Sequence, residues 1–590
     1  MPNINKIIKE KSWFLLLFTV FIFSFLLDMY VLTHYNLSYG RDGPFYDLQV
    51  LNILKTGFTS SNDPPLAYYM LTPFVMITGN SFLGIKIGMS LIGSLMAFPA
   101  FFLTEIFSKK LNVESKVPAL LSAFLITVNP FYFGMIGDFM QNLVGVFFLL
   151  LLLYFAVKWF ENTKEWKKYG VITIILLLCN IFTHIYTGIL AIVLFTALIV
   201  FNFVFKAYKT RKVHIFDVKV GLILGILIVG GLAVLFAVYP LMFSKFTTVL
   251  SFMNSSSTGS GPDLGRGGSG NPIIFATLPF LLGAFATFTI LYNKIKSRKY
   301  IKSTIIDKKT YLAWLYIVMT SVLVILSVFP SIDSQYRGRF IMLAFVPIAL
   351  MVPLGLKYIE NRISKKYPSK NVLKMTVITT IAVLFAFSAF YSASGEFSGM
   401  GPSISTEQYN ELVKLKGSID NDTIVVVGDY HTGYWVQYVL GTQIATGNVD
   451  DVHQQHPNET VYAISLTENM QRGFGNYQYT WNPLFPYSFP LGGLSFDNSR
   501  SKPNNMPVGF NDTTKNNMTP PSDLGNRTMF NRSGLPPSGN FIPPNSNRTS
   551  ENVFNGNKPS NAGGNGMNQD YSSYGTLIYS GNYVKVYKIS

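Results

Sequence analysis

Residues 13–33 read WFLLLFTVFIFSFLLDMYVLT, a run long enough to cross a membrane as one helix, since about 20 mostly apolar residues suffice. Lys6, Lys9 and Lys11 precede the run. It is too long for the apolar part of a signal peptide and no small-residue cleavage site follows it, so we expect a retained span. Similar runs follow at 85–107, 117–135, 141–159, 170–187, 188–205, 219–241, 273–292, 311–329, 340–356 and 374–393. The sequence therefore predicts a polytopic α-helical membrane domain over residues 1–393, with about eleven transmembrane helices.

The composition agrees with a membrane protein. Only 13% of the 590 residues are charged, against about 25% in soluble proteins. A net charge of +17 would suit nucleic-acid binding, but the basic residues gather in short segments between apolar runs, as in cytoplasmic loops. Nucleic acid is therefore excluded as a partner. The single cysteine, Cys179, lies inside an apolar run, which excludes a disulfide framework and a cysteine-based metal site.

The distribution of basic residues predicts the orientation of the chain. Every second connecting segment is strongly basic, and the others hold few lysines or arginines. The basic segments contain Lys109, Lys110 and Lys116; Lys164, Lys167 and Lys168; Lys206, Lys209, Arg211 and Lys212; Lys294, Lys296, Arg298, Lys299 and Lys302; and Arg362, Lys365, Lys366 and Lys370. Because basic loops stay on the cytoplasmic side, we expect a multi-pass plasma-membrane protein with a cytoplasmic N-terminus and residues 394–590 outside.

The outer region divides into three parts. Residues 394–468 are expected to form a small α/β domain, with strands at 423–427 and 459–466 and a short helix at 432–440. Residues 469–570 are rich in Asn, Gly, Pro and Ser and are expected to be disordered, because they hold too few aliphatic residues to form a core. Residues 571–590 contain a hairpin turn signal at Ser580-Gly581-Asn582, and this hairpin is expected to return and complete the α/β domain.

Two acidic residues are candidates for chemistry on the outer side. Asp42 lies just beyond the first span, where a carboxylate can hold a divalent cation such as Mg²⁺ or Mn²⁺, or accept a proton from an attacking hydroxyl. Asp138 lies in a very short loop between two apolar helices, where a charge is costly and usually has a purpose. Both are expected on the same face of the membrane and so could converge. The alternatives are a solvated Asp42 in an ordinary polar loop and an Asp138 that caps the helix starting near Phe139.

Three basic residues are candidates for binding phosphate. Arg337 and Arg339 begin the tenth expected span from outside, and guanidinium groups match phosphate oxygens; the alternative is contact with lipid headgroups. His184 ends the fifth span, where it could bind phosphate or a sugar, or simply pack. The outer loop 244–272 reads either as a lid over a lipid-facing groove or as a linker.

The first outer loop resembles that of the GT-C superfamily of integral-membrane glycosyltransferases. The resemblance lies in Arg41-Asp42-Gly43-Pro44-Phe45-Tyr46, a helical stretch ending in Lys55-Thr56-Gly57, and Asp63-Pro64-Pro65-Leu66. This pattern is similar to the protein mannosyltransferase and aminoarabinose transferase branch. Gly137-Asp138 stands where the superfamily often has its second acidic site.

A second stretch resembles the acceptor-binding motif of the oligosaccharyltransferase catalytic subunit. It runs from Gly428-Asp429-Tyr430 to Trp435, although Val427 and Gly428 stand where that motif has two tryptophans. The resemblance implies that Asp429, Tyr430 and Trp435 bind the acceptor.

The superfamily resemblance implies a glycosyltransferase that takes a sugar from a polyprenyl-phosphate carrier in the membrane lipid. The acceptor would be a glycan, a lipid or a protein. Asp42 would act as general base or metal ligand with help from Asp138, and Arg337, Arg339 and His184 would hold the donor phosphate. The rival interpretations are a transporter or lipid flippase, and a non-catalytic membrane-anchored surface protein.

Overall fold

The computed structural model describes residues 4–61, 63–110, 116–161, 165–210, 345–367, 371–398, 400–420, 423–466 and 570–589, with a few isolated positions between 225 and 343. The expected spans at 219–241, 273–292 and 311–329 lie outside these ranges, as do Arg337, Arg339, the loop 244–272 and the segment 469–569.

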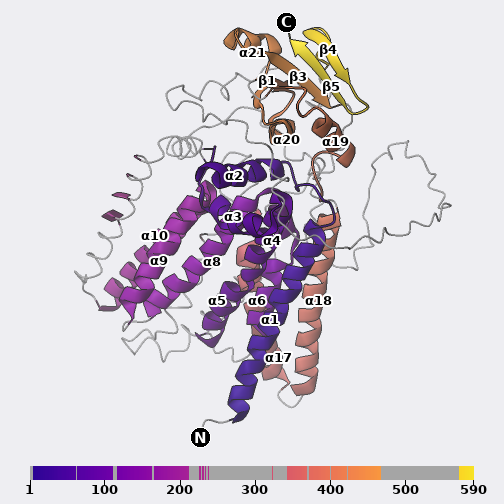
Figure 1. The fold of residues 1–590 in the computed structure, drawn as a ribbon. Helices are drawn as coiled ribbons and strands as arrows, with labels where there is room; N and C mark the ends of the chain where they lie inside the picture. The colour runs from indigo at the N-terminus through magenta and orange to yellow at the C-terminus, as the bar shows by residue number, and fades with distance from the viewer. Residues whose placement is uncertain are drawn as a thin grey trace, which may run out of the picture.

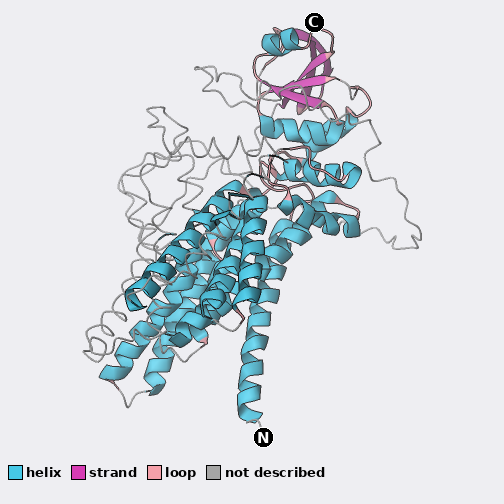
Figure 2. Cartoon of the chain, turned by 90° about the vertical axis from the view of Figure 1, so that its left-hand side faces the viewer, coloured by secondary structure: helices cyan, strands magenta, loops and turns pink. Residues whose placement is uncertain are grey.

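The N-terminal two thirds of the described chain is a bundle of long helices, which run side by side in both ribbon views (Figures 1 and 2). They are α1 (Ile4–Leu32), α4 (Ser81–Leu95), α5 (Ala97–Lys110), α6 (Val117–Thr127), α7 (Pro130–Asp138), α8 (Met140–Glu161), α9 (Trp166–Thr183), α10 (Ile185–Thr210), α17 (Phe345–Lys366) and α18 (Asn371–Ser398). Within the described ranges, five helical stretches are long and apolar enough to span a membrane, or six if the bent pair α6–α7 counts as one. The chain is thus a membrane protein, and the described part accounts for some of the eleven spans expected.

One expected span consists of two successive helices that still form a single span-length stretch, and another is bent where the sequence carries helix-start signals. The run at 85–107 is the successive helices α4 and α5, which meet at Met96. The run at 117–135 is α6 and α7, which are bent by 41° at their junction. There the side chain of Asn129 accepts the backbone N–H of Tyr132 at 2.9 Å, and Pro130 is the first residue of α7. Asn at the N-cap and Pro at the first helical position both start a new helix, so the continuous helix expected here was wrong.

Two helices of the segment that connects α1 to α4 lie across one end of the bundle. They are α2 (Gly43–Thr56) and α3 (Leu66–Thr78). The end of α2 is set by Gly57, whose positive φ of 83° lets its N–H close on the carbonyl of Ile53. This is the stop that the sequence predicted, because glycine adopts the left-handed conformation without strain. In Figure 1, α2 lies between the long helices and the C-terminal sheet, where it packs against α20 (Tyr430–Leu440).

The C-terminal part is an α/β unit. Its elements besides α20 are α19 (Thr406–Lys414), β1 (Ile424–Val427), β2 (Gln443–Thr446), α21 (Val449–Gln455), β3 (Val461–Leu466), β4 (Gly575–Ser580) and β5 (Val584–Ile589). The strand order is β2-β1-β3-β5-β4. β1 pairs in parallel with β2 and β3, whereas β5 is antiparallel to β3 and β4. The terminal hairpin therefore joins the sheet through β5, with Ile464 opposite Val586.

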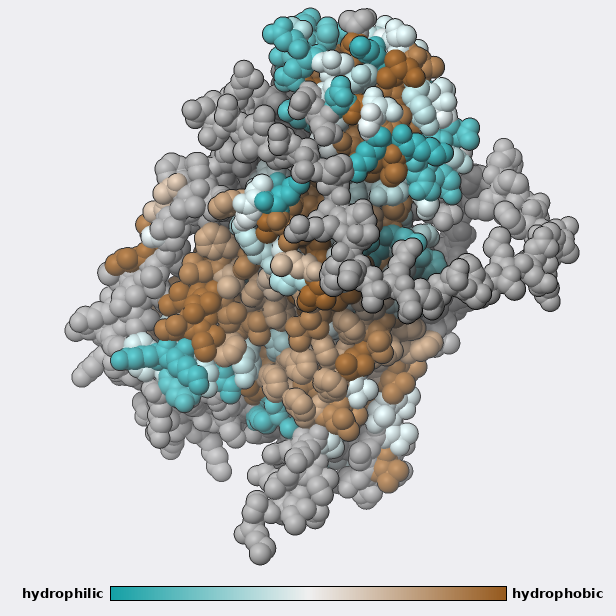
Figure 3. All heavy atoms as spheres, in the orientation of Figure 1, coloured by the Kyte–Doolittle hydropathy of each residue, from teal (hydrophilic) through white to brown (hydrophobic). Residues whose placement is uncertain are grey.

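The hydropathy of the surface also differs between the helical bundle and the C-terminal unit. In Figure 3 hydrophobic residues cover the helical bundle, while hydrophilic residues predominate on the C-terminal unit, with a smaller hydrophilic group at the opposite end of the helices. This opposite end is where the basic segments begin: Lys109 and Lys116 both pair with Glu105, at 2.8 and 3.3 Å, and so join α5 to α6. A hydrophobic belt between two polar ends suits a chain embedded in a bilayer.

Candidate functional site

The candidate site is built around the loop 39–42, which joins α1 to α2. Gly40 has a φ of +73°, and a Cβ at this position would lie 2.5 Å from the carbonyl oxygen of Gly137 and 2.6 Å from Oδ1 of Asp138. On its other side Gly40 donates its N–H to the carbonyl of Gly401 at 3.0 Å. The loop is therefore clamped between the end of α7 and the segment that follows α18, and only glycine fits both the space and the backbone conformation.

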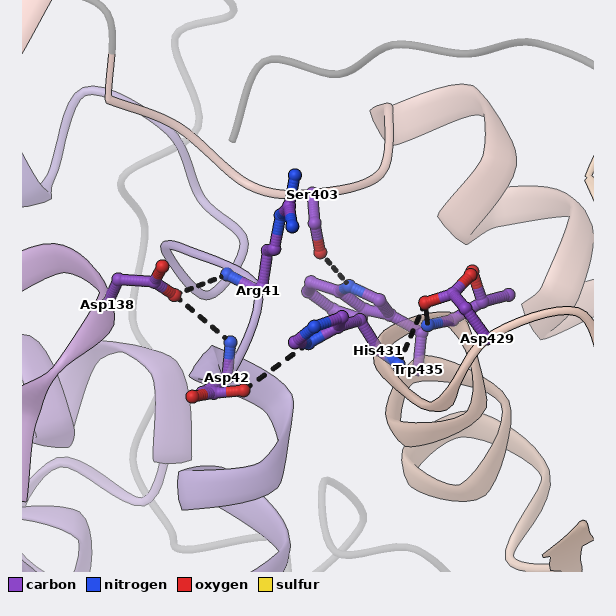
Figure 4. Close-up of polar contacts among 8 residues, drawn as sticks. Arg41, Asp42, Asp138, Ser403, Asp429, His431 and Trp435 are labelled. Atoms are coloured by element: carbon purple, nitrogen blue, oxygen red, sulfur yellow. Dashed lines mark hydrogen bonds and ion pairs between the residues drawn. The ribbon is translucent and has the colours of Figure 1, made fainter. Parts of the chain in front are cut away.

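Asp138 organises this loop. Its Oδ1 accepts the backbone N–H of Arg41 at 2.7 Å and that of Asp42 at 3.3 Å (Figure 4). Asp138 is the last residue of α7 rather than the cap of the following helix, so the capping alternative was wrong. The structure does bring Asp42 and Asp138 together, through this carboxylate-to-backbone contact.

The Asp42 carboxylate is left available for other contacts. Asp42 occupies the N-cap position of α2, but its φ of −90° and ψ of −2° are helical and its side chain makes no capping hydrogen bond. The Arg41 guanidinium points away from it in Figure 4. Instead Oδ1 of Asp42 lies 3.3 Å from Nδ1 of His431 on α20, and the Asp42 side chain is 34% exposed.

His431 was missed by sequence reasoning. It lies within the stretch that resembles the acceptor-binding motif, but nothing in its neighbourhood indicates a contact with a loop so distant in the chain. The signal would have been the motif itself: the same stretch places Asp429 at the start of α20, and this fixes which face of the helix His431 occupies.

The surroundings of Asp42 are aromatic and acidic. Phe45 of α2 and Tyr434 of α20 lie with ring centroids 4.9 Å apart. Burial raises the pKa of the Tyr46 phenol, and the nearby charges of Asp42, Asp138 and Asp63 raise it further. Asp63 is held in this region because Gln141 donates to the carbonyl of Pro64 at 3.1 Å. Three carboxylates thus surround one buried tyrosine.

Asp47, one turn further along α2, is a buried acid of a different kind. Its carboxylate accepts a hydrogen bond from Ser38, and Ser81 and the charge of Lys86 also favour its ionised form. Burial outweighs these contacts and raises the pKa of Asp47 to about 7. Because the side chain is wholly buried, Asp47 is not exposed to a substrate in this structure.

The predicted acceptor-binding residues have distinct placements on α20. The Asp429 carboxylate caps this helix by accepting the N–H groups of His431 and Thr432. Tyr430 is 47% exposed. Trp435 is fully buried and donates its indole N–H to Ser403 at 2.8 Å. The prediction that Trp435 binds an acceptor does not fit this position, because its ring is part of the core and its one polar atom is already used.

The remaining described candidate is His184, at the break between α9 and α10, with its ring 5.2 Å from that of Tyr186. For a divalent cation, the described residues include no group of three or more His, Cys, Asp or Glu side chains that could hold one. Oδ1 of Asp138 is engaged with backbone N–H groups and Oδ1 of Asp42 faces an imidazole, and a cation held between the two carboxylates stays a prediction.

Comparison with known proteins gives similarity in structure only. No protein-family model matches the chain, and no curated protein matches it in sequence. The solved structures that resemble it include two of ArnT from Cupriavidus metallidurans. The structure bound to undecaprenyl phosphate has a TM-score of 0.47 at 12% identity and covers 77% of this chain and 93% of its own. The apo structure has a TM-score of 0.44 at 11% identity, with the same coverage.

Proposed function

We propose that this chain is a glycosyltransferase that moves a sugar from a polyprenyl-phosphate carrier to an acceptor on the extracytoplasmic side of the membrane. One observation supports this most: the Asp42 carboxylate is held at the junction of the helical bundle and the C-terminal unit, uncapped and one third exposed. The superfamily resemblance at Asp42 and Asp138 supports the same reaction.

Asp42 is the general base of this reaction. Its carboxylate takes the proton of an acceptor hydroxyl while that oxygen forms a bond to the anomeric carbon. The bond between the anomeric carbon and the phosphate oxygen breaks, and the polyprenyl phosphate leaves with the electron pair. Asp138 acts through Asp42, by fixing the backbone from which Asp42 projects. Arg337 and Arg339 are proposed to bind the leaving phosphate, since a charge-assisted pair strengthens as negative charge develops.

The decisive experiment compares Asp42→Asn with the unchanged protein, at equal expression, in membranes supplied with radiolabelled undecaprenyl-phosphate mannose or glucose. Asn keeps the shape of the side chain and removes the base. We expect transfer of label to fall at least about 100-fold, the low end for loss of a general base.

The matched control is Asp451→Asn, which changes an exposed acid on α21. It should leave transfer unchanged. Full transfer by Asp42→Asn would show that another group takes the proton, and an unchanged protein that transfers neither sugar would remove the basis for this donor class.

A further inference from the structure

We infer that His431 is the positioning residue for Asp42, so that the C-terminal unit completes the catalytic site by delivering an imidazole to the base. This inference rests on the proposed function, and it adds a residue that the resemblance does not assign.

The contact itself is the first support. Nδ1 of His431 lies 3.3 Å from Oδ1 of Asp42, and the two side chains are 15% and 34% exposed. Nδ1 is buried and makes no hydrogen bond with the residues that the structure describes, so the Asp42 carboxylate, 3.3 Å away, is the group positioned to satisfy it. A buried polar atom left without a partner is costly, and catalytic hydrogen bonds are often long before substrate binds. We therefore expect the distance between Nδ1 of His431 and Oδ1 of Asp42 to shorten when substrate binds.

The helix that carries His431 is held firmly in place. Asp429 accepts the N–H groups of His431 and Thr432, at 2.9 and 3.1 Å, and the Thr432 hydroxyl at 2.6 Å. One turn further along the helix Trp435 is buried and bonded to Ser403. Both contacts appear in Figure 4. His431 therefore projects from a fixed helical turn rather than from a loose loop.

One short segment ties this helix to the loop of Asp42. Residues 401–403 bind Trp435 through Ser403, and they bind Gly40 through the carbonyl of Gly401 and the bridge between Gly40 and Pro402. The Asp42 loop and the His431 helix thus share a single backbone support. A connection of this kind sets the Asp42–His431 separation without depending on either side chain.

The Asp42 carboxylate faces His431 directly, and Asp138 accepts the backbone N–H of Asp42. The Tyr430 ring lies 3.8 Å from the imidazole ring. An N–H from His431 to Oδ1 fixes the rotation of the carboxylate and leaves Oδ2 to take the proton of the acceptor. A small error in this orientation would slow the transfer strongly, since misplacement by about 1 Å can lower a rate about 100-fold.

The test compares two replacements of similar shape. Asn at position 431 keeps an N–H donor near the position of Nδ1, whereas Leu has the same branching and no donor. We expect His431→Leu to lower kcat about 10- to 100-fold with the KM for undecaprenyl-phosphate mannose changed less than about 2-fold. His431→Asn should recover most of the lost kcat. His456→Asn is the control, because that residue also lies 3.3 Å from a carboxylate, Glu459, in the same unit, and it should have no effect.

Equal transfer by the Leu and Asn variants would overturn the inference, whether both are active or both are impaired. A thermal melt separates this result from failure of the proposed function. If the pair exists, the melting-temperature loss of Asp42→Asn combined with His431→Leu is smaller than the sum of the two single losses, and additive losses overturn the pairing. Coupled losses in a protein that transfers no sugar would overturn the proposed function and retain the pairing.

Discussion

Gly40 is the residue on which the shape of the candidate site depends most directly. Gly40→Ala places a methyl group against Gly137 and Asp138 in a backbone conformation that alanine disfavours. We expect a stability loss of about 2–4 kcal/mol, from the combined strain and overpacking, together with a large fall in transfer. The measurement is the melting temperature in detergent beside the transfer rate.

Gly57→Ala provides the comparison, because Gly57 also has a positive φ, of 83°, but a Cβ there meets nothing within 4 Å. Its cost should be about 1 kcal/mol, from backbone strain alone. Equal losses at the two positions would show that the contact with Asp138 does not constrain the loop.

Asp47 makes stability depend on pH. Its pKa is about 7 in the folded protein against an ordinary value of 3.8, so the folded state keeps a proton that the unfolded state releases. The contribution of this retained proton to the free energy of unfolding is fully present below about pH 4 and is lost as the pH rises to about 7. Asp47→Asn cannot ionise. Relative to the unchanged protein its stability should therefore improve by up to about 4 kcal/mol between those pH values. Melting temperatures across this range check the prediction, and the same pH dependence in both proteins would contradict it.

The sequence could indicate single acidic residues but not their partners. Asp42 and Asp138 stand out because charges beside apolar runs are rare. Whether Asp138 caps a helix or holds the Asp42 loop depends on how α7 approaches residues 39–42, and this is a matter of tertiary packing. The contact of His431 with Asp42 depends on tertiary packing even more, because the two residues lie in different parts of the chain.

At the scale of elements, the terminal hairpin is secured by one carboxylate. Glu411 of α19 accepts the backbone N–H groups of Asn582, Tyr583 and Val584 at 2.9–3.0 Å. Glu411→Ala leaves these donors without an acceptor. We expect a loss of about 3 kcal/mol and faster hydrogen exchange in β5, measured by mass spectrometry. Glu407→Ala removes an exposed acid from the same helix and should cost under about 1 kcal/mol; an equal effect of the two would contradict the anchoring role.

Local signals predicted some elements and missed others. Gly57 marked the end of α2, and the run Ile424–Val427 marked β1. Asn129 and Pro130 are also a helix-start signal, but they lie inside a long apolar run that was interpreted as one span. β2 was missed because it is short and half-exposed. β2 is stabilised by its parallel pairing with β1. Such pairing depends more on the tertiary context than on local β-propensity.

At the scale of the whole molecule, the hydrophobic belt separates the candidate site from the basic connecting segments. The positive-inside rule predicts that the site and the C-terminal unit lie outside the cell. This orientation matters for the proposed reaction, because a lipid-borne sugar and its acceptor must meet on the same side of the membrane. Orientation follows from the charges of the loops, and these are readable from sequence even where the fold is not.

The orientation can be tested with single cysteines in a Cys179→Ser background, since Cys179 is the only natural cysteine. Ser418→Cys lies at an exposed position of the C-terminal unit, and Lys168→Cys lies at an exposed position near the start of α9. An impermeant maleimide should label Ser418→Cys in intact cells and Lys168→Cys only after the membrane is opened. The reverse pattern would place Asp42 and His431 in the cytoplasm, and an outward-facing transferase would then be impossible because the site would lie on the opposite side from its acceptor.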